Sequence, residues 1–134
     1  MIKPVHNSVF PENTPIGSVL NSISSSAHSN AVAHGFYDDS SILLKFLEVH
    51  DEPKIHEAAR RDFVLAQLAK IGCEVGEAVD AIQHGEELKL FEELADIIIR
   101  TLDLAGYLDC KIGDWVVEKM KKNMTRPYKH GKTC

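Results

Sequence analysis

Residues 65–85 read LAQLAKIGCEVGEAVDAIQHG, and this stretch decides the fold. Its apolar residues recur at steps of three and four, the spacing of one face of a helix. They predict a long helix over residues 55–83, and His84-Gly85 predicts its end, because glycine readily takes the left-handed conformation that closes a helix. The apolar stripe of this helix consists of Leu65, Leu68, Gly72, Val75, Val79 and Ile82.

A second long helix is predicted over residues 87–108. It carries so many apolar residues that we expect it to be buried nearly all round. Such a wide apolar surface exceeds what one neighbouring helix can cover, so it indicates oligomerisation through the long helices. The stripe at the centre of this surface consists of Phe91, Ala95, Ile98, Leu102 and Ala105.

The remaining segments are shorter. Prolines, Gly17 and a serine-rich patch predict an irregular N-terminal arm over residues 1–26, within which a helix could begin near Leu20. Short helices are predicted over residues 27–36, 41–49 and 111–124, the last with Trp115, Val116 and Met120 facing inward. Because no alternating strand pattern occurs, the predicted fold is all-α: an antiparallel helical bundle of about four to five helices, with residues 27–134 as its domain.

Composition limits the classes of function. A chain of 134 residues with 44% hydrophobic and 26% charged residues is typical of one soluble domain. The net charge of -5 argues against nucleic acid as a partner. Three widely spaced cysteines favour a reducing cytoplasm over a disulfide framework or a zinc site. The sequence also shows neither a signal peptide nor a membrane span, so no membrane partner is expected.

Two acidic motifs are the candidate metal-binding segments: Glu74-Val75-Gly76-Glu77 and Glu93-Leu94-Ala95-Asp96. Each places two carboxylates on one face of its helix, about one turn apart. Ionised carboxylates inside apolar helices need a partner or a cation. Four of them on neighbouring helices would form an oxygen-only site suited to Mg2+ or Mn2+.

Two alternatives stay open at this point. Arg100 stands one turn after Asp96 and one turn before Asp103, so these three residues could form a plain ion network, and Lys70 could pair with Glu74. A di-iron or di-manganese oxidase would also use inward carboxylates. It would need Glu-x-x-His on two helices, however, and neither long helix has a histidine three residues after a carboxylate; His84, near a helix end, is the nearest approach.

Two glycines and a basic tail complete the pattern. Gly72 and Gly76 are costly inside a helix, which predicts the close approach of another backbone or of a ligand. From residue 119 to the end, the sequence has six basic and no acidic residues. Among them, Lys119 and Arg126 share a helical face with Asn123, and these residue types suit phosphate oxygens and sugar hydroxyls. A basic helix end that favours the helix dipole is the simpler interpretation of the tail taken alone.

Together these segments resemble the MazG-like all-α nucleoside triphosphate pyrophosphohydrolases, the superfamily that includes dimeric dUTPases and phosphoribosyl-ATP pyrophosphatases. The resemblance runs from Asn30-Ala31-Val32-Ala33-His34-Gly35-Phe36 through Glu74-x-x-Glu77 and Glu93-x-x-Asp96. It ends with Lys119-x-x-x-Asn123-x-x-Arg126-Pro127-Tyr128-Lys129-His130-Gly131. Cys73 departs from the pattern, because many members carry a further glutamate there.

The resemblance implies a specific activity. Family members use Mg2+ to hydrolyse a nucleoside triphosphate between the α and β phosphates, which releases a nucleoside monophosphate and pyrophosphate. It implies Glu74, Glu77, Glu93 and Asp96 as metal ligands and catalytic residues, and assembly as a homodimer or homotetramer. The residues that it implies for substrate binding are Asn30 and Phe36 near the base, and Lys119, Asn123, Arg126, Tyr128, Lys129 and His130 near phosphates or sugar. The alternative is a non-catalytic helical oligomer that senses nucleotides or binds proteins.

Overall fold

The computed structural model describes residues 15–49 and 53–126, and within them it contains five α-helices and no strand. The all-α prediction is therefore confirmed. The helices are α1 (Ile16–Ala33), α2 (Asp38–Val49), α3 (Pro53–His84), α4 (Glu87–Tyr107) and α5 (Ile112–Met124).

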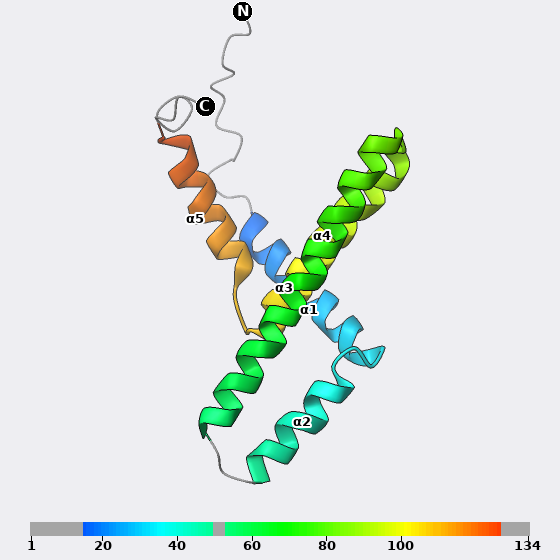
Figure 1. Cartoon of the computed structure of the whole chain (residues 1–134). Helices are drawn as coiled ribbons and strands as arrows, with labels where there is room; N and C mark the ends of the chain where they lie inside the picture. Colours follow the sequence, from blue (N-terminus) through cyan, green and yellow to red (C-terminus); the bar gives the residue numbers. More distant parts are fainter. Residues whose placement is uncertain (1–14, 50–52, 127–134) are drawn as a thin grey trace, which may run out of the picture.

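The two long helices form an antiparallel hairpin with a very short turn (Figure 1). Gly85 has a φ of 73°, the left-handed conformation that the sequence predicted for the end of α3. The N–H of Glu86 donates to the carbonyl oxygen of Ala81 at 2.9 Å, which closes the last turn. Both long helices begin and end within about two residues of their predicted limits.

The other helices pack around this hairpin. α1 crosses it and contacts α4, α5 lies along α1, and α2 lies along the first half of α3 (Figure 1). The pairs α1/α5, α2/α3 and α3/α4 each run antiparallel. In the described part of the chain, no helix has the length and hydropathy needed to cross a membrane.

The irregular arm predicted over residues 1–26 is wrong where the structure describes it, because residues 16–26 belong to α1. The serines that suggested a loop are used in helical contacts. Ser18 Oγ donates to the carbonyl oxygen of Pro15 at 2.8 Å, and buried Ser24 Oγ donates to the carbonyl oxygen of Leu102 on α4 at 2.7 Å. The short helix predicted from residue 27 is the end of α1, and residues 1–14 lie outside the described part.

The buried face of α3 differs from the predicted one. Glu74, Ala78 and Ala81 are buried against α4, at steps of four and three. The predicted apolar stripe lies one residue further along at each step, about 100° around the helix, and its five large side chains are 47–58% exposed. The two stripes are interleaved in the sequence, and the smaller side chains face α4.

Two further expectations on burial are wrong within one chain. Helix α4 is not covered all round, since Leu94, Ile98 and Ile99 are 45–57% exposed. Trp115 on α5 is 69% exposed rather than facing inward, whereas Val116 and Met120, predicted with it, are half-buried. The buried contact of α5 with α1 is made at Gly113 against Gly17. The apolar surface of the long helices is thus left uncovered by the described helices of this chain, as oligomerisation through that surface would require.

Close helix contacts occur at glycines other than the predicted ones. A Cβ at Gly106 would lie 2.5 Å from His28 Cβ, and one at Gly113 would overlap the carbonyl oxygen of Gly17. These two positions let α1 pack closely on α4 and α5. At Gly72 and Gly76, by contrast, an added Cβ would meet nothing within 4 Å in the described chain.

Gly106→Ala tests this packing. The added methyl group has no room against His28 and Ser24, so the free energy of unfolding should fall by about 1–3 kcal/mol. Urea unfolding followed by circular dichroism measures it. Thr101→Ala on the exposed side of the same helix is the control and should change stability by less than about 0.5 kcal/mol. Equal stability of the two variants would contradict the close approach of α1.

Candidate functional site

Three of the four predicted carboxylates come together between α3 and α4. One carboxylate oxygen each of Glu74, Glu77 and Glu93 lies within 4.8 Å of the others. Glu74 and Glu93 are only 8% and 7% exposed, whereas Glu77 is exposed. The group therefore opens to solvent on the side of Glu77 and is closed by the hairpin on the other side. We call Glu74, Glu77 and Glu93 the carboxylate group.

The fourth predicted ligand, Asp96, lies one turn further along α4 and is exposed. It does not join the carboxylate group, but its negative charge acts on Glu93. Burial raises the pKa of the Glu93 carboxyl, and the charge of Glu77, a hydrogen bond with Glu74 and the charge of Asp96 raise it further. Without a cation, the crowded acids thus favour keeping a proton on Glu93.

Arg100 pairs across the hairpin rather than along its own helix. Its Nε donates to Glu74 Oε1 at 2.6 Å, and the Glu74 side chain is only 10% exposed. The alternative of an ion network of Arg100 with Asp96 and Asp103 along α4 is therefore not the arrangement that forms. Helical spacing identified possible partners within α4, but the arginine side chain reaches the buried carboxylate on α3 instead.

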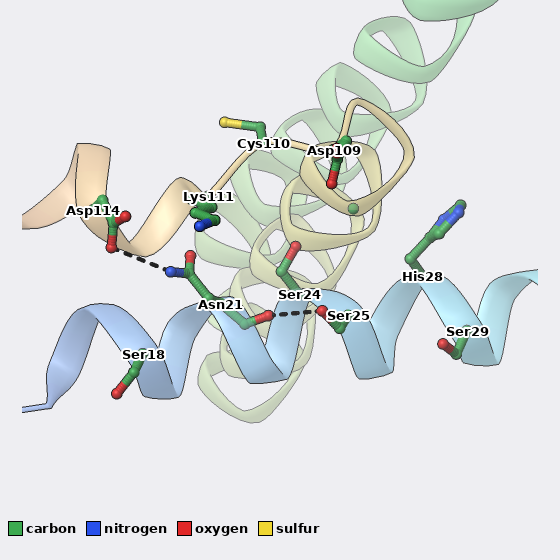
Figure 2. Close-up of a pocket in the computed structure, with 11 residues that line it drawn as sticks. Ser18, Asn21, Ser24, Ser25, His28, Ser29, Asp109, Cys110, Lys111 and Asp114 are labelled. Atoms are coloured by element: carbon green, nitrogen blue, oxygen red, sulfur yellow. Dashed lines mark hydrogen bonds between the residues drawn. The ribbon is translucent and has the colours of Figure 1, made fainter.

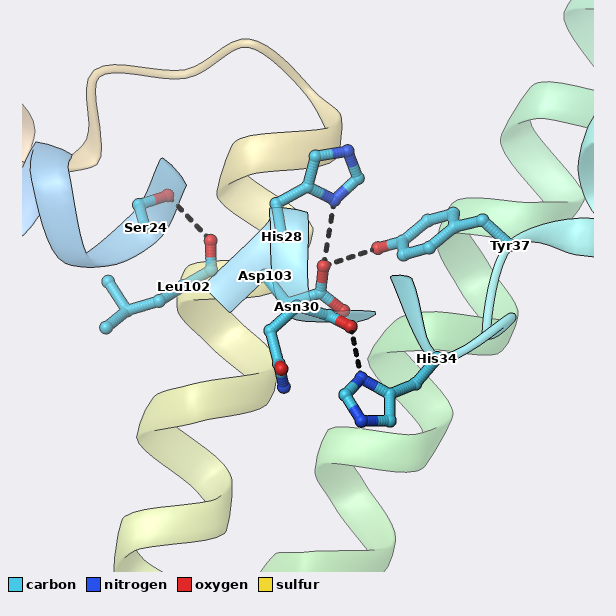
Figure 3. Close-up of polar contacts among 7 residues, drawn as sticks. All are labelled: Ser24, His28, Asn30, His34, Tyr37, Leu102 and Asp103. Carbon is cyan, nitrogen blue, oxygen red and sulfur yellow. Dashed lines mark hydrogen bonds and ion pairs between the residues drawn. The ribbon is translucent and has the colours of Figure 1, made fainter. Parts of the chain in front are cut away.

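Asp103 belongs to a different network, which holds α1 and the start of α2 against α4 (Figure 3). Its Oδ1 accepts hydrogen bonds from Tyr37 Oη at 2.8 Å and from His28 Nδ1 at 2.9 Å. Burial raises the pKa of the Tyr37 hydroxyl, and the hydrogen bond and charge of Asp103 raise it further. The aromatic rings of Tyr37, Tyr107 and Phe63 pack beside this network, with centroids 4.7–5.6 Å apart.

Sequence reasoning missed this network. Asp103 lies 75 residues from His28 and 66 from Tyr37, so no local spacing connects them. The one signal in the sequence is the position of Asp103 inside an apolar helix, because a carboxylate there needs hydrogen-bond partners. The network matters for the site because it holds in place the turn that carries Phe36, the residue before Tyr37.

The predicted base-binding residues lie on that turn and on α1. Phe36 is 67% exposed and lines a cavity of about 670 Å³ between α2 and α3. Lys70, one turn before Glu74, lines the same cavity, so the cavity extends along α3 toward the carboxylate group. Asn30 is exposed on α1, and its carbonyl oxygen accepts a hydrogen bond from His34 Nδ1 at 2.8 Å (Figure 3).

The described part of the basic tail lies on α5, which packs on α1, whereas the carboxylate group lies between α3 and α4. Lys119 and Asn123 are exposed on α5, and Arg126 is exposed just after it. Helix α5 packs on α1 and diverges from the turn end of the hairpin (Figure 1). Tyr128, Lys129 and His130 lie outside the described residues.

A second cavity of about 500 Å³ lies between α1 and the segment that joins α4 to α5 (Figure 2). Its polar side chains already serve the packing of the helices. Asn21 Nδ2 donates to Asp114 Oδ1 at 3.2 Å, while Asn21 Oδ1 accepts from the N–H of Gly113 at 2.8 Å. Ser24 and Ser25 donate to backbone carbonyl groups. This cavity is therefore part of the scaffold around α1.

The family model of the MazG nucleotide pyrophosphohydrolase domain matches residues 64–130. The chain belongs to this family. The matched residues include the carboxylate group, Asp96, Arg100 and all of α5, whereas α1 and α2 precede them. Neither the comparison with curated proteins nor that with solved structures gave a match. Members of the MazG family are nucleotide pyrophosphohydrolases that generally depend on a divalent metal, so this protein is a hydrolase.

Tyr37→Phe tests the network around Asp103. The change removes one hydrogen bond to a partly buried carboxylate and keeps the ring, so the free energy of unfolding should fall by about 1–2 kcal/mol. Chemical denaturation measures it. The control is Tyr107→Phe, which removes a hydroxyl from the same aromatic group and leaves both bonds to Asp103 in place. If Tyr37→Phe were no less stable than this control, the network would not anchor the turn.

Proposed function

We propose that the protein hydrolyses a nucleoside triphosphate between the α and β phosphates, giving a nucleoside monophosphate and pyrophosphate, with Mg2+ as its metal and Mn2+ as a possible substitute. The observation that carries this proposal is the carboxylate group: three acids from two helices, within 4.8 Å, inside the family-matched residues. Oxygen-only ligand sets suit hard divalent cations. The donor set therefore fits the metal that the family generally requires.

Each acid has a part in this proposal. Buried Glu74 and Glu93 would hold the ion from the two helices, and exposed Glu77 would complete the set on the solvent side, where the phosphates enter. Asp96, one turn away, would become a ligand or hold the attacking water by accepting its hydrogen bond. When bound, such a metal lowers the pKa of a coordinated water and neutralises phosphate charge. The raised pKa of Glu93 supports this assignment, because it reflects burial of the carboxyl first and then the negative charge of Glu77, Glu74 and Asp96, which a cation would balance.

For the nucleotide, Phe36 and the cavity beside it would receive the base, because an aromatic face stacks on any base. Asn30 would contact base or sugar. Phosphate contacts from Lys119, Asn123, Arg126, Tyr128, Lys129 and His130 remain a prediction. Since α5 packs on α1 and diverges from the turn end of the hairpin (Figure 1), we propose that the tail reaches a site on a second copy.

Assembly as a homodimer or homotetramer is proposed on the exposed stripe of α3. Five large aliphatic side chains line that stripe, and Gly72 and Gly76 leave its centre open to a close helix contact. Exposed apolar surface of this extent on two long helices is typical of an interface. A cytoplasmic location and the absence of a nucleic-acid partner also remain predictions, from cysteine content and net charge.

The alternatives gain no support. Family membership favours catalysis over a purely sensing or protein-binding role. In the described residues, the metal-binding arrangement consists of carboxylates without histidine, which does not fit a di-iron oxidase.

Glu77→Gln tests the activity. Glu77 is exposed, so its substitution should leave the fold intact while kcat for pyrophosphate release falls by about 100-fold or more. The assay is pyrophosphate release from a panel of nucleoside triphosphates with Mg2+. Glu57→Gln, on the same helix and far from the carboxylate group, is the matched control and should keep full activity. Full activity of Glu77→Gln, or no turnover of any nucleotide by the unmodified protein, would refute the proposal.

Val79→Glu tests the interface. A charge placed in the middle of the α3 stripe should separate the copies, which is measured as a loss of molar mass in light scattering after gel filtration. Ile42→Glu on α2 is the control, since Ile42 is also exposed, at 68%, but lies outside the stripe. An unmodified protein that elutes as a monomer, or an unchanged mass for Val79→Glu, would contradict assembly through α3.

A further inference from the structure

We propose that Arg100 is a built-in counter-cation of the carboxylate group: it balances Glu74 in the metal-free chain and competes with a divalent cation for that carboxylate. This inference rests on the metal site proposed above. It assigns Arg100 the role of a positioning residue, because it acts through Glu74 rather than on the substrate.

Glu74 lies where its charge needs a partner. Its side chain is 10% exposed between the long helices, where an unpaired charge would be strongly destabilising. Arg100 Nε lies 2.6 Å from Glu74 Oε1, a short charge-assisted hydrogen bond across the hairpin. The planar guanidinium group of arginine suits such a pair with a carboxylate.

The two partners are unequally buried. The Arg100 side chain is 43% exposed, while that of Glu74 is held in the hairpin. Arginine can therefore turn its charged end into water, whereas Glu74 cannot leave the site. The ion pair can therefore be broken by movement of the Arg100 side chain, and this movement leaves the packing of α3 on α4 in place.

Charge repulsion makes the arginine a competitor of the metal. Glu74 shares its surroundings with Glu77 and Glu93, so any ion bound by the three oxygens lies close to Glu74. A divalent cation there would meet the guanidinium at short range, and repulsion between like charges at such distances weakens binding by about tenfold or more. Metal binding therefore requires Arg100 to move away. Metal-free stability and metal affinity should then respond to Arg100 in opposite directions.

The experiment compares Arg100→Gln with Arg61→Gln in the full chain. Arg61 is the matched control, because its pair with Asp62 on α3 is exposed on both sides, at 70% and 67%. Thermal unfolding in EDTA and calorimetric titration with Mg2+ alone are the two readouts. Arg100→Gln should lower the Tm in EDTA by about 5 °C and tighten Mg2+ binding about tenfold, while Arg61→Gln should change neither.

Mg2+ binding by Arg100→Gln that equals or falls below that of the unmodified protein would overturn the competition and leave the metal site standing. An unmodified protein that binds no Mg2+ would instead refute the metal site itself, and this inference with it. If Arg100→Gln unfolds in EDTA, Arg100→Lys takes its place. Lysine keeps the positive charge but lacks the planar guanidinium group, so Arg100→Lys should tighten Mg2+ binding less, by about threefold. If Arg100→Lys binds Mg2+ no more tightly than the unmodified protein, the inference is overturned.

Discussion

Glu74 and Glu93 face each other's helix in the interior of the hairpin, and the structure depends on how their charge is balanced there. Two buried carboxylates with Glu77 beside them repel one another and lack water. Burial and these neighbouring charges raise the pKa of Glu93, and Arg100 pairs with Glu74 across the helices. Under the proposals above, a bound cation would take over the balance of charge at Glu74 and Glu93.

The scaffold around this site is fixed by a second set of contacts further along α4. Gly106 lets α1 approach closely, and Asp103 ties α1 and the α1–α2 turn to the same helix through His28 and Tyr37. Phe36 and its cavity are thereby held at a set place relative to the carboxylate group. Helix α4 thus carries Glu93 of the carboxylate group and, about three turns later, the anchor of the turn that bears Phe36.

The sequence predicted what depends on local periodicity. The long helices, the turn at Gly85 and the meeting of Glu74, Glu77 and Glu93 follow from spacings within about 20 residues. The roles of Arg100 and Asp103 were left open, because helical spacing suggests only partners on the same helix and their partners lie on other helices or turns. The serines of α1 suggested a loop, because their use in contacts such as that of Ser24 with Leu102 is set by tertiary packing alone.

The error over the buried face of α3 has a physical meaning. Two stripes with the same helical period lie one residue apart, and periodicity alone cannot tell which of them meets α4. The chain places charge and alanines, Glu74, Ala78 and Ala81, on the inner stripe and large aliphatic residues on the outer one. Small side chains let the hairpin helices come close enough to bring carboxylate oxygens of both helices within 4.8 Å of one another. The large aliphatic side chains stay on the outer surface, and they stabilise the protein by burial only when another surface covers α3. The closeness of the acids and the exposure of the apolar stripe are therefore two results of the same division of residues on one helix.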